Sequence, residues 1–471
     1  MADPAQHTHS GVSGGNLLGP PAAPDAAELG EWVIERRQRL LSLVGDLDDD
    51  QLVGPVLPII NPLHWEIGHV GWFQERFVLR EVSGEAPIFA QADALWDSAR
   101  VPHDTRWWLR LPSRDATVEY LLETADRVVT KLKDASPVAR DGNPGSGRER
   151  LLYVVRYVTH HEDWHSEAII YTRQTLGLPA PSLPVPAVSA SVAWQGAGSD
   201  GESTAFSDDV SIPGGRVMLG GARRSPFVFD NEKWAHEVQI EPFELARTPV
   251  TQSQLADFAD DGGYRRRNLW SEEGWAWRSE ASAEQPLYWR RGAHGWECRR
   301  FDHWAPIEPG HPAVHVNFFE AEAWCRWAHR RLPTEGEWEA AAIGETGPDG
   351  RLRSSRRRWP WGDEAPTQER ANLDCWHLGT LDVGSCAAGD SAFGARQLIG
   401  NVWEWTSSLF GPYPGFERDF YAENSEPWFG SRRVLRGGCW ATRSELIRPT
   451  LRNYFTPDRR DVFAGLRTVA L

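Results

Sequence analysis

Apolar residues recur every three to four positions in four separate segments of the first third of the chain, and polar residues fill the positions between them. These segments cover residues 29–47, 65–79, 116–132 and 148–176. A helix with this spacing carries one apolar stripe, and four such helices can bury their stripes against one another. The pattern therefore predicts an all-α four-helix bundle over residues 26–178.

The pattern changes after the fourth segment. Residues 179–214 are rich in proline, serine and glycine, which is typical of a linker. Beyond them, residues 215–471 predict an α+β domain in which short elements alternate with long connections rich in glycine, tryptophan and arginine. Its clearest expected elements are strands at 217–219 and 243–245 and helices at 318–330 and 334–342. Residues 1–25 lack periodicity and are expected to form a disordered tail.

The amino-acid composition argues against several classes of binding partner and against a disulfide-stabilised fold. With 50 basic and 66 acidic residues the formal net charge is −16, which disfavours nucleic acid and anionic membranes as partners. No run of about 18 apolar residues and no secretory signal pattern occurs, so a cytoplasmic protein without a membrane partner is predicted. The five cysteines are widely spaced and form no CxxC pair, which argues against a disulfide framework. The 25 tryptophans are typical of a loop-rich fold held together by large rings.

The strongest local signal is a pair of histidines in the fourth helical segment, His161 and His165. Four residues apart on a helix, they project from one face and lie one above the other, as two ligands of a single metal ion must. His160 lies about 100° away around the same helix and cannot share that face. The second segment offers a third ligand, His69, whereas His64 would point to a different side. The apolar neighbours of His69 favour a position facing the bundle interior.

These residues alone leave the identity of the metal open. Histidines at this spacing are also common in helices that bind no metal. Three imidazoles suit zinc as well as a redox metal, and they leave coordination positions open on either ion. Zinc-dependent hydrolysis would also require a general base, for which Glu162 and Glu167 are candidates.

Longer motifs add a resemblance to known families. The first half contains NPLHWEIGHVGWFQERFVLR and HHEDWHSEAIIYTRQTLG, and through them it resembles the DinB-like helical domain. The second half resembles the formylglycine-generating-enzyme-like domain, which is related to C-type lectins. The motifs that carry this second resemblance are RTPVT, HPAVHVNFFEAEAWCRW, RLPTEGEWEAAA, GNVWEWTSS, RVLRGGCWAT and RNYFTPDRRDVFAGLR. Joined in one chain, the two halves are similar to ergothioneine-biosynthetic sulfoxide synthases and selenoneine synthases.

The resemblance implies a cofactor and a reaction. It implies iron(II), held by His69, His161 and His165 at the interface of the two domains, with molecular oxygen as a co-substrate. The other substrates would be small molecules. One is hercynine, the trimethylated form of histidine, and its imidazole ring would receive a chalcogen atom from the second. Since the chain has no room for a methyltransferase domain, a separate protein would have to supply hercynine.

The closing motif of the second half implies residues that bind hercynine. Asn453 matches a family residue near its trimethylammonium and carboxylate groups, and Tyr454 stands where the family has an aromatic ring able to face the cation. Tyr421 lies in the region where the family places a catalytic tyrosine that donates a proton. Tyr413 is the alternative for that role.

Departures from the family pattern bear on the second substrate. Sulfoxide synthases that use γ-glutamylcysteine bind its charged groups with an acidic residue and an arginine. Here those two positions are Phe455 and Arg459. Trp164 replaces a glutamine, and His103 replaces one of two arginines while Arg106 keeps the other. An aromatic pocket with few fixed charges suits a neutral ligand, so the preferred hypothesis is a selenoneine synthase that uses a 1-seleno sugar. The alternatives are a sulfoxide synthase using cysteine or γ-glutamylcysteine and, more remotely, a non-catalytic lectin-like module.

Overall fold

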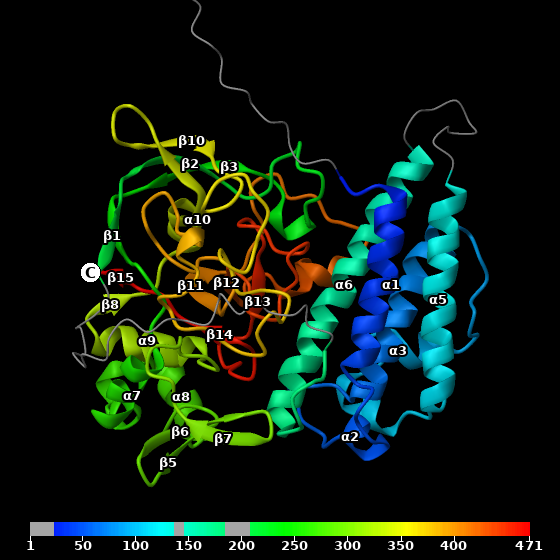
Figure 1. The fold of residues 1–471 in the computed structure, drawn as a ribbon, viewed down its shortest axis with the longest axis horizontal. Coiled ribbons are helices and arrows are strands. Elements are labelled where there is room, and N and C mark those ends of the chain that lie inside the picture. Colours follow the sequence, from blue (N-terminus) through cyan, green and yellow to red (C-terminus); the bar gives the residue numbers. More distant parts are fainter. Residues whose placement is uncertain (1–22, 136–145, 184–207) are drawn as a thin grey trace, which may run out of the picture.

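The computed structural model describes residues 23–135, 146–183 and 208–471. Two units lie side by side, a helical bundle and a unit of short strands and helices (Figure 1). The predicted fold class, an all-α bundle followed by an α+β domain, is confirmed. The predicted tail lies outside the described residues except for its last three positions, and so does most of the predicted linker.

Long helices form the bundle, and their starts follow ordinary capping chemistry. The carboxylate of Asp25 accepts hydrogen bonds from the first amides of α1, and the Ser113 hydroxyl accepts one from the amide of Ala116 in α5. The helical elements are α1 (Ala26–Ser42), α2 (Asp49–Val53), α3 (Leu63–Gln74), the π-helix η1 (Glu75–Val82), α4 (Ala92–Trp96), the 3-10 helix η2 (His103–Trp108), α5 (Arg114–Asp134) and α6 (Ser146–Leu176). No helix in these ranges combines the length and apolar character needed to cross a bilayer.

The first helix is shorter than the predicted segment 29–47, because α1 ends at Ser42. The apolar residues that follow remain buried, but they lie in a turn. Arg114 donates hydrogen bonds to the carbonyls of Val44 and Leu47 and so satisfies groups that a longer helix would have bonded internally. Hydrophobic periodicity cannot detect such a turn, because the buried positions keep their spacing.

The second unit is built from small sheets. Their strand orders are β1-β4-β15-β8, β3-β2-β10-β9, β13-β12-β11-β14 and β5-β6-β7. The strands are β1 (Asp209–Ile212), β2 (Gly215–Leu219), β3 (His236–Ile240), β4 (Phe243–Ala246), β5 (Trp289–Gly292), β6 (Gly295–Arg300), β7 (His303–Pro306), β8 (Arg330–Arg331), β9 (Gly344–Thr346), β10 (Leu352–Arg356), β11 (Trp403–Leu409), β12 (Arg433–Arg436), β13 (Asn453–Phe455), β14 (Ala464–Gly465) and β15 (Val469–Ala470). The α-helices are α7 (Gln252–Asp260), α8 (Glu272–Glu280), α9 (Phe318–Trp327) and α10 (Glu335–Ile343).

The start of the second domain differs from the prediction. β1 falls inside the expected linker 179–214 and pairs antiparallel with β4 along its whole length. The second domain therefore begins by Asp209. Four residues are too few for an alternating pattern to be distinguished from the surrounding polar sequence.

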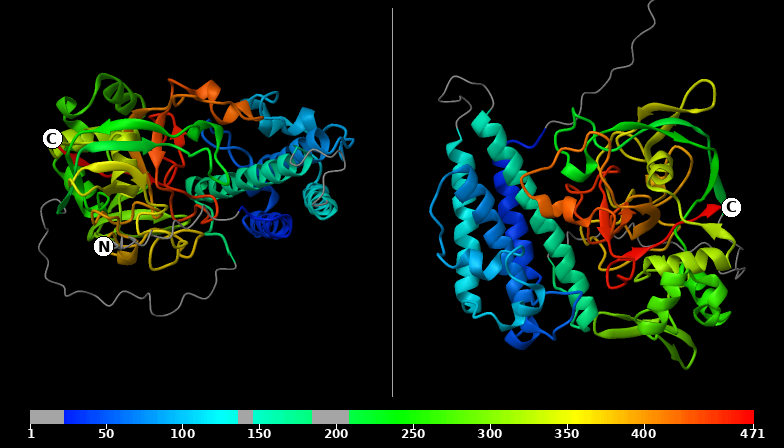
Figure 2. Two further views of the ribbon diagram at one scale, coloured as in Figure 1. Left: turned by 90° about the horizontal axis from the view of Figure 1, so that it is seen from above. Right: turned by 180° about the vertical axis from the view of Figure 1, so that it is seen from behind.

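Helix α6 is shared by both units, as two further views show (Figure 2). One side packs on α1 and α3, and the other side contacts the second unit. The buried carboxylate of Glu167 accepts hydrogen bonds from the Trp403 indole and the Thr442 hydroxyl. Nearer the end of α6, Gln174 bonds to the backbone of Phe301. A side chain on α6 can therefore serve a site that both domains build.

Candidate active site

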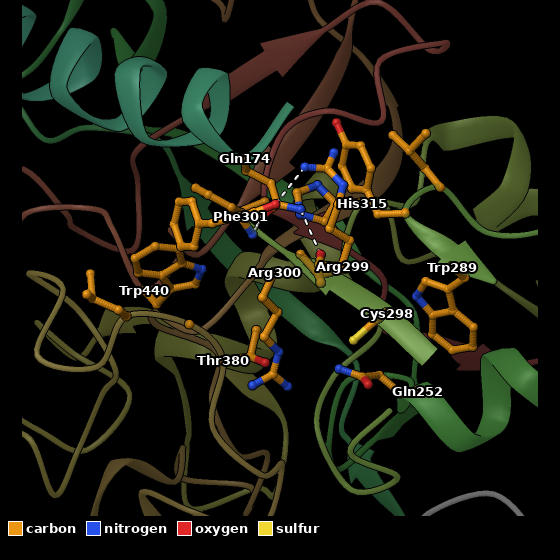
Figure 3. Close-up of a pocket in the computed structure, with 16 residues that line it drawn as sticks. Gln174, Gln252, Trp289, Cys298, Arg299, Arg300, Phe301, His315, Thr380 and Trp440 are labelled. Carbon is orange, nitrogen blue, oxygen red and sulfur yellow. Dashed lines mark hydrogen bonds between the residues drawn. The ribbon is translucent and has the colours of Figure 1, made fainter. Parts of the chain in front are cut away.

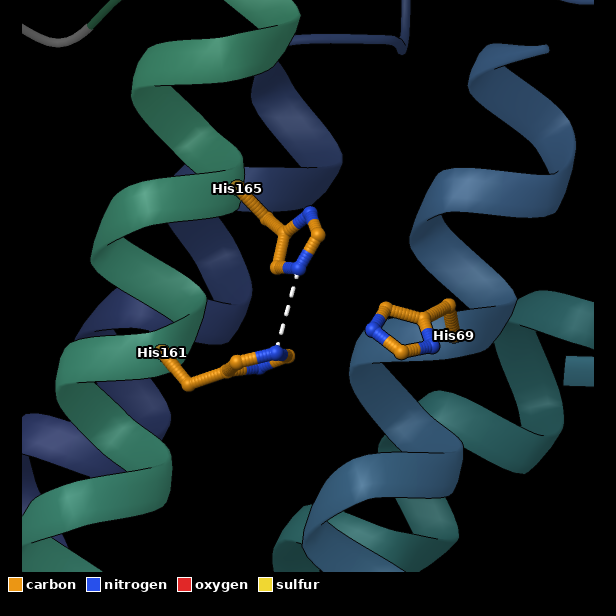
Figure 4. A group of neighbouring side chains, drawn as sticks. All are labelled: His69, His161 and His165. Carbon is orange, nitrogen blue, oxygen red and sulfur yellow. Dashed lines mark hydrogen bonds between the residues drawn. The ribbon is translucent and has the colours of Figure 1, made fainter. Parts of the chain in front are cut away.

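Three histidines meet between α3 and α6 (Figure 4). His69 comes from α3, whereas His161 and His165 come from α6. One ring nitrogen of each lies within 4.8 Å of those of the others. Within the described ranges, no other set of three histidine, cysteine or carboxylate side chains has this metal-binding geometry. The structure therefore brings together the three histidines that the sequence singled out as candidate ligands.

Packing fixes the orientation of His69. Its ring stacks on Trp65 and Trp72, with centroid distances of 5.0 and 5.5 Å. Its Nδ1 lies 2.7 Å from the backbone oxygen of Trp96 in α4. α4 approaches this closely because Gly68 has no side chain, since a Cβ there would lie 2.2 Å from the indole nitrogen of Trp96. Nδ1 is thus occupied, and Nε2 remains for a ligand role.

A buried carboxylate orients His165. Its Nδ1 lies 2.6 Å from Oε1 of Glu66, and Oε2 of Glu66 accepts a 2.7 Å hydrogen bond from Asn61. Arg106 donates to the other end of the Asn61 amide. Burial alone would raise the pKa of the Glu66 carboxyl, but the polar neighbours together lower it. The Glu66 carboxylate therefore holds the His165 ring through Nδ1, and Nε2 faces His161.

This donor set fits a divalent metal ion. Nε2 of His161 lies 3.1 Å from Nε2 of His165, while the buried Nδ1 of His161 has no hydrogen-bond partner. Burial, together with the neighbouring imidazoles, keeps the pKa of His161 and of His69 well below the usual value, so both rings are neutral. Converging imidazoles, two of them held at the outer nitrogen by a carbonyl and a carboxylate, are the usual surroundings of a bound transition metal. Such ligands suit iron as well as zinc.

The competing histidines are turned away, as predicted. Nε2 of His64 lies 3.0 Å from the Thr117 hydroxyl, on the side of α3 that faces α5. His160 is fully buried, and its Nδ1 lies 3.3 Å from the Asp163 carboxylate. Neither histidine belongs to the cluster.

The carboxylates considered as bases for zinc hydrolysis are also engaged elsewhere. Glu162 is fully buried and pairs with Arg37 of α1 at 2.9 Å. Glu167 binds Trp403 and Thr442 at the domain interface. The structure thus gives the zinc hydrolase alternative no base at the histidines from either candidate.

Comparisons with known proteins agree with the division of the chain into two domains. Residues 19–169 match the DinB superfamily, and residues 197–470 match the sulfatase-modifying factor enzyme 1-like domain. The chain is 37% identical to the hercynine oxygenase of Mycolicibacterium thermoresistibile over 454 residues, which make up 95% of each chain. The chain belongs to the hercynine oxygenase family.

Two further relatives show how much of the chain each similarity covers. The hercynine oxygenase of Mycobacterium tuberculosis is 38% identical, with 92% of this chain and 96% of that protein covered. The formylglycine-generating enzyme of Streptomyces coelicolor is 31% identical, but the match covers 55% of this chain and 87% of that protein. As a member of the hercynine oxygenase family the chain is an enzyme. The hypothesis of a non-catalytic lectin-like module is therefore wrong.

In this hercynine oxygenase family member, Tyr421 reaches the histidine cluster from the second domain. Its ring lies edge-on to Phe73 at 4.8 Å and to His161 at 6.1 Å between centroids. Burial raises the pKa of Tyr421 to about 12, although a hydrogen bond with Ser98 lowers it in part. The hydroxyl therefore keeps its proton at neutral pH.

Tyr413, the alternative for the catalytic tyrosine, lies elsewhere. The Arg452 guanidinium stacks on its ring at 4.0 Å, and His236 lies 4.8 Å away. Both neighbours belong to the second domain, so the structure places Tyr413 in that domain's interior. The loop before η8 (Ala422–Asn424) has no periodicity, which is why the sequence could not choose between the tyrosines.

The residues expected near hercynine lie on β13, which pairs with β12. Asn453 uses Oδ1 to accept a hydrogen bond from the amide of Tyr454. The Tyr454 ring stacks on Phe410 at 4.0 Å, and its hydroxyl donates to the Asn424 carbonyl, in the segment that follows Tyr421. Both candidates thus sit on a strand tied to the segment that carries Tyr421.

Arg459 is neutralised within the protein. Its guanidinium forms two hydrogen bonds with the Asp461 carboxylate, at 2.6 and 2.7 Å, and one with the carbonyl of Ile59 in the bundle. The same guanidinium lies 5.1 Å from the centre of the Phe455 ring. The aromatic residue in the acidic position therefore borders an arginine that already has a carboxylate partner.

The remaining predicted substrate residues belong to the first domain. Arg106 stacks on Trp65 at 3.9 Å, in addition to its bond with Asn61. His103 lies 2.6 Å from the Ile60 carbonyl. Trp164 packs against Phe229 at 4.7 Å and against His161 at 6.4 Å. Trp164 therefore borders the histidines directly and Arg106 borders them through Trp65, whereas His103 contacts the segment before α3.

Several residues of the site were missed by the sequence reasoning. Glu66 could have been found, because it is a lone carboxylate in a largely apolar helical segment three residues before His69. Phe73 stacks on His161 at 3.5 Å between ring centroids, but in the sequence it cannot be distinguished from an ordinary core residue. Asn61 and Trp96 act through contacts with other elements, and local patterns carry no signal for that.

A separate pocket lies near the C-terminal end of α6 (Figure 3). Its lining includes Gln174, Arg299, His315 and Trp440. None of the predicted site residues lines it. Gln174 follows His165 by nine residues, which is roughly 13 Å along a helix. This pocket is therefore distinct from the histidine cluster.

Proposed function

We propose that the protein is an oxygen-dependent iron(II) enzyme that replaces the C2–H bond of the hercynine imidazole by a bond to a chalcogen. The proposal is supported by family membership over nearly the whole chain and by the three converging histidines. His69, His161 and His165 would hold the iron. When bound, that iron would supply the redox chemistry through which molecular oxygen accepts the electrons of the reaction.

Residues of the chain itself would bind and orient hercynine and donate a proton at the metal site. Tyr421 keeps its proton because burial raises its pKa, and its ring stands beside His161, so its hydroxyl is suited to donate a proton at the metal site. Asn453 and Tyr454 would bind the charged end of hercynine. The indole and phenyl rings around the histidines exclude water from the reacting groups.

The second substrate in this proposal is a neutral 1-seleno sugar. The observation that carries this choice is the charge balance of the predicted binding residues. Asp461 already neutralises Arg459, and the adjacent position that would bind an ammonium is Phe455. Trp164 adds a further aromatic surface. A γ-glutamylcysteine molecule would leave its ammonium without an acidic partner there, which costs several kcal/mol in a buried site.

The alternative is an ergothioneine-type sulfoxide synthase that uses cysteine or γ-glutamylcysteine. The identity of 37–38% to hercynine oxygenases over nearly the whole chain supports it. Both functions use the same metal site and hercynine.

Oxygen consumption by the iron-loaded enzyme tests these choices. Hercynine is offered with a 1-seleno sugar, with cysteine or with γ-glutamylcysteine, and the organic product is identified by mass spectrometry. We expect rapid turnover with the seleno sugar and a product that contains selenium. Turnover with a thiol alone would refute the seleno sugar assignment, and absence of hercynine-dependent turnover with all three would refute the proposed reaction.

A further inference from the structure

Tyr421 belongs to an irregular segment, so something other than secondary structure must hold it in place. Asp419, Phe420 and Tyr421 are consecutive, and each contacts the bundle. The carboxylate of Asp419 accepts a hydrogen bond from the hydroxyl of Tyr153 on α6. It also lies 3.2 Å from the ammonium of Lys233. The side chains of Asp419 and Lys233 are only 10% and 12% exposed, so this contact is shielded from water.

Phe420 and Tyr421 continue the contact with the bundle from Asp419 toward the histidines. The Phe420 ring packs on Tyr157 of α6 at 4.6 Å and on Phe77 of η1 at 4.9 Å. Tyr421 then meets Phe73, which itself stacks on His161. The segment therefore packs between α6 on one side and α3 with η1 on the other. Helices α3 and α6 also supply the three candidate metal ligands.

The residue spacing along α6 explains how the contact with Asp419 is related to the position of the histidines. Tyr153, Tyr157, His161 and His165 are spaced by four residues, so they form a stripe of neighbours that winds around the helix by about 40° at each step. The start of the stripe binds Asp419, and its end supplies two ligands of the candidate metal site. One rigid helix thus sets the distance between the anchor of the Tyr421 segment and the metal ligands.

We propose that Tyr153 is a positioning residue that places Tyr421 at the metal site through Asp419. The proposal deepens the proposed function, since it rests on Tyr421 acting there. A hydrogen bond to an ionised carboxylate is about twice as strong as one between neutral groups, which suits it to fix a flexible segment. Tyr153 itself touches neither the histidines nor the residues predicted to bind substrate.

A second set of bonds holds the rear of the segment and makes the role of Tyr153 separable from folding. Asp230 accepts hydrogen bonds from Asn424 at 3.1 Å and from Ser425 at 2.7 Å. These bonds do not involve Tyr153. Removing the Tyr153 hydroxyl should therefore loosen the front of the segment without unfolding the second domain.

The test compares Tyr153→Phe with Tyr288→Phe. Tyr288 makes a matched contact, because its hydroxyl also joins the second domain to α6, through Thr175 at 3.1 Å, but far from the Tyr421 segment. Hydrogen exchange of the backbone amides of residues 419–425 is measured by mass spectrometry on the full-length protein. Turnover is measured with hercynine and the second substrate, in the wild-type background and in Tyr421→Phe.

In Tyr153→Phe we expect these amides to exchange about fivefold faster, because the local opening free energy falls with the lost hydrogen bond. We expect kcat to fall by roughly tenfold, with an unchanged KM for hercynine, because a displaced proton donor slows the reaction without weakening binding. Tyr288→Phe should change neither quantity. Adding Tyr153→Phe to Tyr421→Phe should cause no further loss of kcat, because the two residues act in series.

Unchanged exchange in Tyr153→Phe, or a further tenfold loss of kcat in the double variant, would overturn the proposal. If the wild-type enzyme turned over no hercynine at all, the proposed function would fail, whereas the exchange comparison would still decide whether Tyr153 holds the segment. The two failures are therefore distinguishable.

Discussion

At the scale of single residues, Glu66 holds one histidine of the candidate metal site in place. Its carboxylate orients His165 and is itself buried. We expect Glu66→Gln to weaken iron(II) binding by about 10- to 100-fold, because the amide cannot accept the His165 proton as strongly as the carboxylate does. Anaerobic competition with a chelator of known affinity measures the effect.

Glu167→Gln is the matched control for that variant. Glu167 is also a buried carboxylate near the ligand helices, but its partners are Trp403 and Thr442. Burial raises its pKa, so glutamine resembles its protonated form. Iron affinity should be unchanged in this variant, and an equal loss in both variants would show that Glu66 acts only through stability.

Phe455 allows a direct test of second-substrate choice. We expect Phe455→Asp to raise kcat/KM for γ-glutamylcysteine about tenfold relative to the seleno sugar, because the new carboxylate can pair with an ammonium. Phe455→Leu removes the ring without adding charge and should not favour the thiol. Competition between the two substrates in one reaction gives the ratio directly. An unchanged ratio in Phe455→Asp would place the ammonium elsewhere.

Residue patterns predicted how the three histidines converge better than they predicted the surroundings of the proposed substrate residues, for a physical reason. His161 and His165 share a helical face, and helical geometry is fixed by spacing alone. Arg459 fits its family position, but its pairing with Asp461 depends on how the chain turns after β13. Only the folded structure shows that its charge is already balanced.

At the scale of secondary structure, the close approach of α3 and α4 supports the site. A Cβ at Gly68 would overlap the Trp96 indole, so Gly68→Ala must push α4 and its carbonyl away from His69. We expect destabilisation of about 2–3 kcal/mol, as for overpacking in other cores, together with weaker iron binding. Urea unfolding and chelator competition measure the two effects.

Gly147→Ala is the control, because a Cβ at Gly147 in the first turn of α6 would meet nothing within 4 Å. Alanine favours helix there, so stability should stay equal or rise by up to about 1 kcal/mol. A loss of stability in Gly68→Ala no larger than in this control would contradict the packing argument.

Elements were predictable where apolar residues recur at helical spacing. The long helices and α9 and α10 lie close to the predicted ranges, and their apolar residues are mostly buried. The change from α3 into the π-helix η1 left no trace in the pattern, and neither did the segment that carries Tyr421. Those parts are shaped by contacts between domains, which a one-dimensional pattern does not contain.

At the scale of the whole molecule, the two domains are joined by buried charges. The carboxylate of Asp163 on α6 lies 3.3 Å from Arg36 of α1 and 3.9 Å from Arg443 of the second domain. Its side chain is 1% exposed. Removing one partner from a buried ionic cluster costs about 3–5 kcal/mol, because the remaining charges lose their compensation. The domains should therefore unfold together in the wild type and separately when this cluster is broken.

Calorimetry with and without iron(II) tests that coupling. We expect one transition for the wild type and two for Asp163→Asn, whereas the exposed ion pair that Glu123→Gln breaks on α5 should leave a single transition. All three candidate ligands lie in the bundle, so bound iron should stabilise only the bundle transition of Asp163→Asn, by about 2.7 kcal/mol at 100 times the dissociation constant. In the wild type the same ion should shift the whole transition. Two transitions in the wild type, or an iron effect on both transitions of the variant, would show that the domains are coupled in another way.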